Sequence, residues 1–235
     1  MTTPLFKGPP LEEGPLPALF YFALSDDESL NLDPFNQPVE FLKNERIRIF
    51  SLTIPGHGPN LDPTKAITYW KDLYDQGLDP LSPFFAKAAQ TIEKLGADNV
   101  LSKVAVAGLS RGAFCALHIA ARTPLIRTIL GFAPLTDLNY AQEFAGHAPA
   151  HLDLAPLIPK LCDRTIRFYI GNRDVRTGSE NCFHLVRDLA NEAYEQRIRS
   201  APIEMIVGPS IGHKGHGTSP DVFKHGVSWL LEQLL

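Results

Sequence analysis

The strongest candidate for a nucleophile in this chain is Ser110, at the centre of Gly108-Leu109-Ser110-Arg111-Gly112. An apolar run precedes this pentapeptide and a helical pattern follows it, so we expect the serine on a tight turn from a strand into a helix. Glycines suit such a turn because larger side chains would strike the neighbouring backbone. The turn would expose the hydroxyl and point the first amides of the helix toward the group that it attacks.

A serine hydroxyl needs a base to take its proton and an acid to orient that base. Asp174 follows an apolar run later in the chain and is the first candidate for the acid, with Asp137 in reserve. His213 and His216 both follow the last apolar run, in a glycine-rich stretch. Only one histidine can bond the serine and the acid together, and the distance from the end of that run favours His213.

Other side chains near these candidates have alternative interpretations. His213 and His216 could belong to a zinc site, but nothing nearby supplies a clear third ligand. Three arginines are expected near the mouth of the site: Arg111, Arg173 and Arg176. One of them could bind an acidic group of a substrate, but a solvated or ion-paired position at the surface is the favoured interpretation. His57, in a turn after an early apolar run, is expected to be structural.

The composition excludes several other classes of protein. The 235 residues include 22 Lys+Arg and 26 Asp+Glu, a formal net charge of −4, so no strong positive field is present to bind nucleic acid or an anionic membrane. No apolar run approaches the roughly 20 residues of a membrane span, and the first ten residues lack the apolar stretch of a signal peptide. The three cysteines, without CxxC spacing, predict neither a disulfide framework nor a cysteine zinc site and favour the cytoplasm; they are Cys115, Cys162 and Cys182.

The candidate residues require elements that hold them together, and the hydrophobic pattern predicts an alternation of strands and helices. Six short apolar runs are expected to be strands: 16–24, 46–53, 103–107, 126–133, 166–170 and 203–207. Helical patterns cover 63–78, 82–95, 111–122 and 178–199, and a last helix begins after Ser219 as its cap. Several runs are apolar on both faces, which is typical of parallel strands covered by helices. The pattern predicts one α/β domain over 1–235, with a doubly wound sheet and a possible small cap at 137–164.

Three segments resemble the α/β-hydrolase family: 104–112 around the serine, 169–174 around the aspartate, and 209–213 before the first histidine. The resemblance covers about residues 16–235 and is closest to the small esterase and peptidase-like branch. It implies a mainly parallel, doubly wound sheet of the α/β-hydrolase type, shortened at the N-terminus.

The resemblance also implies the roles of the site residues. Ser110 is expected to be the nucleophile, Asp174 the acid and His213 the base, with the backbone N–H groups of Arg111 and Leu24 forming the oxyanion hole. The family commonly carries His-Gly before the second of these donors. This chain has Phe-Ala there, followed by an acidic cluster at 26–28, which puts the Leu24 assignment in doubt more than the triad.

These roles predict a serine hydrolase, most simply a carboxylesterase that acts on small to medium esters through an acyl-enzyme. Its partner would be a small-molecule acyl substrate, with no cofactor and no metal, and no oligomeric state is predicted. A peptidase or an acyltransferase of the same fold would use the same residues. A non-catalytic binding protein that keeps the hydrolase fold is the rival prediction, supported by the missing His-Gly.

Overall fold

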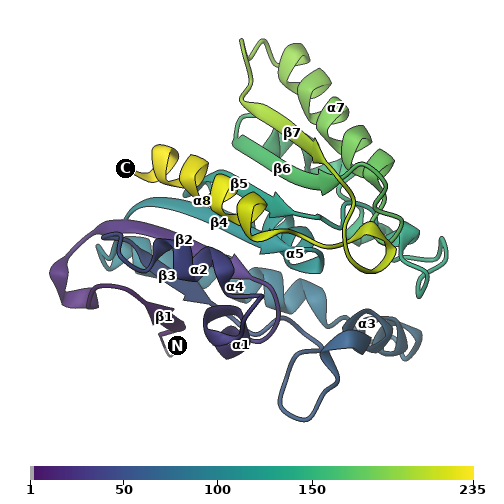
Figure 1. The fold of residues 1–235 in the computed structure, drawn as a ribbon, viewed down its shortest axis with the longest axis horizontal. Coiled ribbons are helices and arrows are strands. Elements are labelled where there is room, and N and C mark those ends of the chain that lie inside the picture. Colours follow the sequence, from purple (N-terminus) through teal and green to yellow (C-terminus); the bar gives the residue numbers. More distant parts are fainter. Residues whose placement is uncertain (1–2) are drawn as a thin grey trace.

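A seven-stranded sheet forms the centre of the computed structural model, which describes residues 3–235. The strands are β1 (Leu5–Lys7), β2 (Leu16–Phe22), β3 (Arg48–Ser51), β4 (Leu101–Leu109), β5 (Ile126–Phe132), β6 (Thr165–Gly171) and β7 (Ile203–Gly208). Their order across the sheet is β1-β3-β2-β4-β5-β6-β7. Only the pairing of β1 with β3 is antiparallel, so the carboxyl ends of β2 to β7 lie along one edge (Figure 1).

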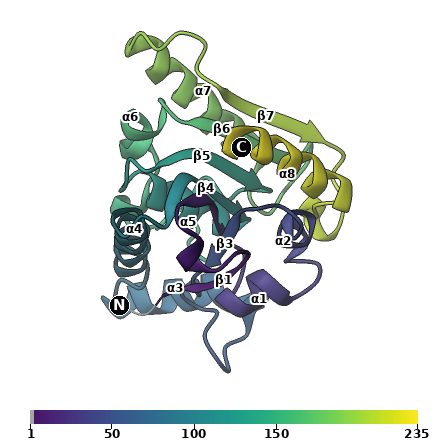
Figure 2. The ribbon, with the colours of Figure 1, turned by 90° about the vertical axis from the view of Figure 1, so that its left-hand side faces the viewer.

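Helices cover both faces of the sheet, as the buried strands require. One face carries α2 (Gln37–Leu42) and α8 (Pro220–Leu234), and α1 (Asp26–Asn31) contributes Leu30 to the same apolar cluster. The other face carries α4 (Leu81–Ala97), α5 (Arg111–Ala120) and α7 (Ser179–Glu195), together with α3 (Ala66–Asp75) and the short α6 (Ile158–Leu161). Figure 2 shows the strands between these two groups of helices. No helix among residues 3–235 has both the length and the apolar composition for crossing a membrane.

The six expected strands and the mainly parallel sheet are confirmed, with ends that differ by one or two residues. The cap of the last helix is also confirmed, since the Ser219 side chain accepts a hydrogen bond from Val222 N–H. Four of the strands and α-helices were not expected from the sequence: the edge strand β1 and the short helices α1, α2 and α6. These three helices have four to six residues each, too few to show a clear 3.6-residue period.

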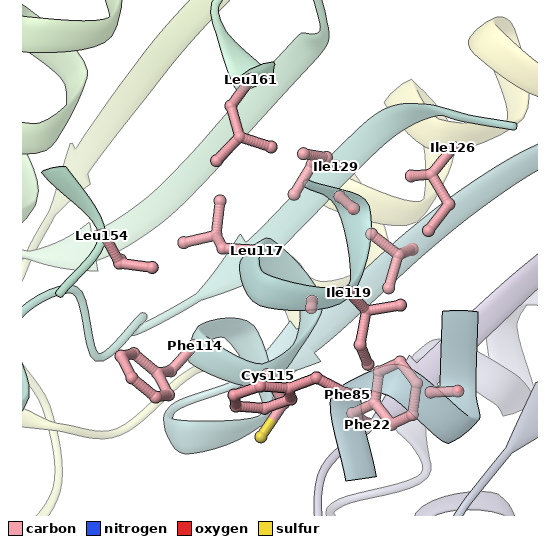
Figure 3. Packing of buried hydrophobic residues seen from close by; sticks show 14 of the residues in the cluster. Phe22, Phe85, Phe114, Cys115, Leu117, Ile119, Ile126, Ile129, Leu154 and Leu161 are labelled. Atoms are coloured by element: carbon pink, nitrogen blue, oxygen red, sulfur yellow. The ribbon is translucent and has the colours of Figure 1, made fainter. Parts of the chain in front are cut away.

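The core consists of two apolar clusters, one on each face of the sheet. The larger cluster surrounds α5, whose ten residues are all buried. Figure 3 shows part of this cluster, in which Phe22 from β2, Phe85 from α4 and Phe114 from α5 come together. Because α5 is packed on every side, the turn that precedes it is held rigidly against β2 and β4.

The segment 137–164, expected as a possible cap, runs as three single-turn 3₁₀ helices followed by α6. Its apolar side chains, among them Phe144, Leu152 and Leu161, belong to the cluster around α4 and α5. The segment therefore packs onto the α5 face of the sheet through its own buried residues. Its polar residues near Tyr140 and Glu143 extend to the edge where the strands end.

Residues 9–14 are bound to the sheet through Arg48, whose side chain has no exposed surface. Its guanidinium donates hydrogen bonds to five backbone carbonyls, of Pro9, Pro10, Leu11, Gly14 and Val100. Several carbonyl dipoles around one cation replace the water that burial removes. This arrangement fixes the segment that links β1 to β2.

Candidate active site

Ser110 lies directly after β4, on the turn into α5, with φ 56° and ψ −119°. That backbone conformation is strained for any residue with a side chain, and it persists only when the surroundings enforce it. The two flanking glycines have no room for a side chain. A Cβ on Gly108 would lie 2.2 Å from the Gly112 carbonyl carbon, and a Cβ on Gly112 would lie 1.9 Å from the Phe22 oxygen.

A continuous chain of hydrogen bonds joins three side chains from different parts of the sequence. His216 Nε2 lies 2.8 Å from Ser110 Oγ, and His216 Nδ1 lies 2.7 Å from Asp174 Oδ2. If Nδ1 carries the proton and donates to the carboxylate, Nε2 is left to accept the serine proton. The arrangement can therefore activate a serine hydroxyl.

Asp174 follows β6 and is almost completely buried, with 2% of its surface exposed. Its Oδ1 accepts from the N–H groups of Arg176 and Thr177, and its Oδ2 accepts from Thr177 Oγ1 as well as from His216. Burial acts to raise the pKa of this carboxyl, but the bonds from His216 and the backbone outweigh it and hold the pKa below its ordinary value. Asp174 is thus ionised and fixed in position around neutral pH.

The expectation that His213 occupies the central position is corrected by this geometry. His213 is exposed, and within residues 3–235 its ring makes no hydrogen bond. The chain instead makes a 3₁₀ turn at His213–Gly215 and returns toward β6 before it reaches His216. The turn passes so close to the strand end that a Cβ on Gly215 would lie 2.3 Å from Arg173 O. The histidine that bonds Ser110 and Asp174 is therefore three residues further along the chain than the sequence predicts, because the turn His213–Gly215 comes first.

The reserve acid and the zinc hypothesis find no support in the geometry. Asp137 caps the 3₁₀ helix Leu138–Tyr140 by accepting from Asn139 N–H, and it makes no bond to either histidine. Within residues 3–235, no group of three or more His, Cys, Asp or Glu side chains is arranged to hold a metal ion.

The two amides expected to form an oxyanion hole differ in their availability. Arg111 N–H opens α5 and has no hydrogen-bond partner in the part of the chain that the structure describes, so it is free to bind an anion. Leu24 N–H also lines the cavity beside Ser110, but it donates to Ser29 Oγ at 3.0 Å. Ala23 N–H donates to the same oxygen at 3.2 Å. The expectation of a free Leu24 amide is thereby corrected.

Behind the serine, the Arg111 side chain is buried with 8% of its surface exposed. Its Nε donates to His57 Nε2 at 2.9 Å, and its Nη2 donates to Pro63 O at 2.8 Å. Burial, together with the Arg111 charge, lowers the pKa of His57 to about 3, so the ring is neutral and able to accept. Burial and the nearby charge of Arg176 lower the pKa of Arg111 to about 10, which leaves it a cation at neutral pH. His57 thus has the structural role that was expected.

Two cavities meet at Ser110. The larger, about 430 Å³, extends over an apolar surface that includes Leu24, Leu32, Phe35 and Phe223. The smaller, about 250 Å³, lies on the other side and is lined mainly by polar and charged residues of the 137–164 segment and of the loops after β6 and β7. The two cavities together have room on either side of the serine hydroxyl for one molecule with an apolar part and a polar part.

Comparison with solved structures decides the fold. A cold-adapted esterase from an Arctic intertidal metagenomic library matches with a TM-score of 0.68 at 18% sequence identity, over 98% of this chain and 87% of its own. A protein from Thermus thermophilus matches with a TM-score of 0.68 at 19% identity, over 94% and 90% of the two chains. An esterase from Pyrococcus furiosus matches with a TM-score of 0.63 at 14% identity, over 93% and 82%. This chain has the α/β-hydrolase fold. No protein-family model matches the sequence, and a search of curated proteins finds no match.

Within the α/β-hydrolase fold, the nucleophile, the acid and the base come in that order along the chain. Ser110 after β4, Asp174 after β6 and His216 after β7 have this order, and all three lie at the carboxyl edge of the sheet. The role of Ser29 was not predicted from the sequence. The capping-box pattern Ser25-x-x-Glu28 indicates a helix start shortly after β2, but not which side chain accepts from Leu24 N–H.

Proposed function

We propose that this chain is a serine hydrolase, and specifically a carboxylesterase that acts on small to medium esters. The observation that carries the proposal is the unbroken hydrogen-bonded chain from the buried Asp174 through His216 to Ser110. A strained turn, which supports a role beyond packing, presents the serine at a cavity of about 430 Å³. The similarity to esterases at the level of the fold supports the same reaction class.

In the proposed mechanism, Ser110 Oγ attacks the ester carbonyl carbon while His216 Nε2 accepts the hydroxyl proton. Asp174 keeps the imidazole oriented and stabilises its positive charge. The carbonyl oxygen becomes an oxyanion that Arg111 N–H can bind at the start of α5. Leu24 N–H can add to this only as a shared donor, because Ser29 Oγ already accepts from it.

The tetrahedral intermediate then breaks its bond to the alcohol oxygen, and His216 returns the proton to this leaving group. The acyl group remains on Ser110 as an ester. Water attacks that ester in the same way, with His216 again taking a proton, and the carboxylic acid leaves as Ser110 regains its hydrogen. All proton transfers in this sequence use one histidine nitrogen.

A fluorophosphonate probe, which reacts with activated serines, tests the proposal directly. We expect the purified protein to be labelled at Ser110 and to hydrolyse 4-nitrophenyl esters. Ser110→Ala should abolish labelling and lower turnover by several powers of ten, because no other group on the turn can form the acyl-enzyme. Normal ester hydrolysis by this variant would refute the assignment.

A non-catalytic binding protein is the second candidate function, and the bond from Leu24 N–H to Ser29 is the observation that favours it. An oxyanion site with one free donor would be a weak one, since each donor contributes several kcal/mol, about 3–4 in measured cases. Binding of a small ligand without any labelling of Ser110 would support this candidate. Hydrolysis of an anilide as readily as of the matching ester would instead favour a peptidase of the same fold.

A further inference from the structure

Arg176 lies where the two cavities meet. Only Thr64, Ser110 and Arg176 line both the larger cavity and the smaller one among the residues that the structure describes. The side chain of Arg176 is half-buried, and its backbone N–H is held by Asp174 Oδ1. Its position is therefore coupled to the same loop that orients His216.

The guanidinium of Arg176 has no acidic partner within ion-pair distance among residues 3–235. A partly buried arginine usually pairs with a carboxylate, because desolvation of an isolated cation is unfavourable. Five of the other eleven arginines pair with a carboxylate within the described residues, as Arg127 does with Asp163 and Arg167 with Glu204. Arg176 has no such partner among residues 3–235, and it lines the space beside the serine hydroxyl that the two cavities share.

A second cation reinforces this charge. Arg111 is buried beside the same cavity, and its bonds go to a neutral histidine and a carbonyl rather than to a carboxylate. The charge of Arg176 is close enough to disfavour the charge of Arg111. An anion placed near both would relieve that repulsion.

Acidic groups near the two cavities form no ion pair with these two arginines among residues 3–235. Glu28 lines the larger cavity, but its carboxylate accepts from Ser25 N–H and Ser25 Oγ in the capping box of α1. Glu143 lines the smaller cavity, as Lys214 does, and forms no ion pair within the described residues, although its charge acts to raise the pKa of Arg111. The Asp174 carboxylate is committed to His216 and Thr177.

We propose that the ester substrate carries a carboxylate group and that Arg176 binds it, so that Arg176 determines the specificity of the site. The inference rests on the proposed hydrolase function and adds the class of substrate. The apolar half of the ester occupies the larger cavity, against Leu32 and Phe35, and the carboxylate lies at the junction beside Ser110. Arginine suits this role because its planar fork donates two parallel hydrogen bonds to a carboxylate.

Paired substrates that differ only in charge test the proposal. The 4-nitrophenyl monoesters of succinic, glutaric and adipic acid are compared with the butyrate, pentanoate and hexanoate esters, in which a methyl replaces the carboxylate. The measured quantity is the ratio of kcat/KM for the anionic ester to that for its neutral partner, after subtraction of the spontaneous rate. We expect Arg176→Gln to lower this ratio at least tenfold for one chain length, with a smaller loss for Arg176→Lys, which keeps the charge but not the fork.

Arg173→Gln is the matched control, since Arg173 is an exposed arginine of the same loop and lines neither cavity. This variant should leave the ratio of the wild-type protein unchanged. The ratio of the wild-type protein should also fall as salt is added, because screening weakens a partly exposed ion pair. A ratio that changes less than twofold in Arg176→Gln at every chain length, or that changes equally in Arg173→Gln, would overturn the proposal.

Failure of this inference can be told apart from failure of the proposed function. If neutral esters are hydrolysed and Ser110 is labelled, but the anionic esters are not accepted by the wild-type protein, the carboxylate proposal is wrong and the esterase proposal stands. If neither ester is hydrolysed and no label attaches to Ser110, the hydrolase proposal itself is wrong.

Discussion

At the scale of single residues, the Ser29 hydroxyl is the acceptor for two backbone N–H groups near the site. The side chain of Ser29 is completely buried, and its hydroxyl oxygen accepts from the amides of both Ala23 and Leu24. These two amides follow β2 directly, and their residues line the larger cavity together with Ser110. The Ser29 hydroxyl therefore holds the loop after β2 in place, and it also competes with any oxyanion for the Leu24 N–H.

Ser29→Ala should lower the free energy of unfolding by about 1–3 kcal/mol, because two buried N–H groups would lose their acceptor. The change would appear as a lower midpoint in urea denaturation. Ser228→Ala, at an exposed serine of α8, is the matched control and should shift stability by no more than about 0.5 kcal/mol. Equal midpoints for the two variants would show that water replaces the Ser29 hydroxyl.

The two histidines of the 213–217 stretch should differ sharply in their effect on turnover. His216→Ala should reduce ester hydrolysis by a factor close to that of Ser110→Ala, because members of a triad act as a unit. His213→Ala should cost tenfold or less, or about 1.4 kcal/mol of barrier, since the exposed His213 ring touches neither Ser110 nor Asp174. Steady-state kinetics on one chromogenic ester would measure both losses. A larger loss in His213→Ala than in His216→Ala would show that His213 is the base.

Ser110 and Asp174 could be proposed from the sequence because each lies shortly after a buried strand, and the structure joins both to one histidine, although their catalytic roles stay a prediction. The prediction failed for the histidine because a turn of only three residues, with Lys214 and Gly215 both at positive φ, leaves no periodic pattern in the sequence. The bond from Leu24 to Ser29 could not be predicted either. It depends on how α1 docks against the end of β2, which is a tertiary contact rather than a local preference.

At the scale of elements, the passage from β4 through Ser110 into α5 depends on the absence of two side chains. Gly112→Ala would place a carbon 1.9 Å from the Phe22 carbonyl oxygen, and neither backbone segment is free to move because both are buried. We expect the variant to lose at least about 3 kcal/mol of stability, at the upper end of overpacking costs. Thermal denaturation followed by circular dichroism would measure this loss.

Gly208→Ala is the control for that substitution. Gly208 ends β7, and a Cβ there would meet no atom within 4 Å. This variant should unfold at or slightly above the temperature of the wild-type protein, because alanine restricts the unfolded chain more than glycine does. If both glycine variants lost the same stability, the close approach of α5 to β2 would not explain the glycine at 112.

The long strands and helices could be predicted from the sequence because their apolar residues repeat over several turns or pleats. The edge strand β1 could not, since three residues next to several prolines carry no alternation. It exists because Phe6 packs against Phe50 of β3 with ring centroids 5.3 Å apart, a contact between distant parts of the chain. The segment 137–164 interrupts the alternation of strands and helices in the sequence, and its role as a small cap stays a prediction; its 3₁₀ turns were not predicted.

At the scale of the whole molecule, buried histidines link stability to pH. His118 has no exposed surface, stacks on Phe85 with centroids 4.5 Å apart, and bonds Leu152 O through Nε2. Burial and the charge of Arg122 lower the pKa of His118 from 6.5 to about 3. Between these values the unfolded chain binds a proton that the folded chain does not, so stability is complete above about pH 6.5 and falls as the pH falls toward 3.

Acidification from pH 7 to pH 5 should therefore cost about 2 kcal/mol through His118 alone, the equivalent of about 1.5 pKa units. His118→Gln keeps a donor for Leu152 O and cannot titrate, so it should remove that part of the loss. Urea midpoints at the two pH values would measure the difference. His147→Gln, at an exposed histidine of the 137–164 segment, should keep the full loss. If the urea midpoints of His118→Gln and of the wild-type protein fell by the same amount between pH 7 and pH 5, His118 would not be a source of the acid sensitivity.

The N-terminal segment depends on Arg48, a single side chain of β3, the strand next to the edge strand β1. Deletion of residues 1–13 would remove three of its five acceptors, the carbonyls of Pro9, Pro10 and Leu11, and leave those of Gly14 and Val100. An apolar side chain at position 48 would need no hydrogen-bond acceptors. Replacing a buried charge by an apolar side chain is often neutral for stability. The shortened chain should then tolerate Arg48→Met better than it tolerates the arginine. In a lineage that lost the segment, we expect the arginine to have been lost with it, so that the two features are inherited as a pair.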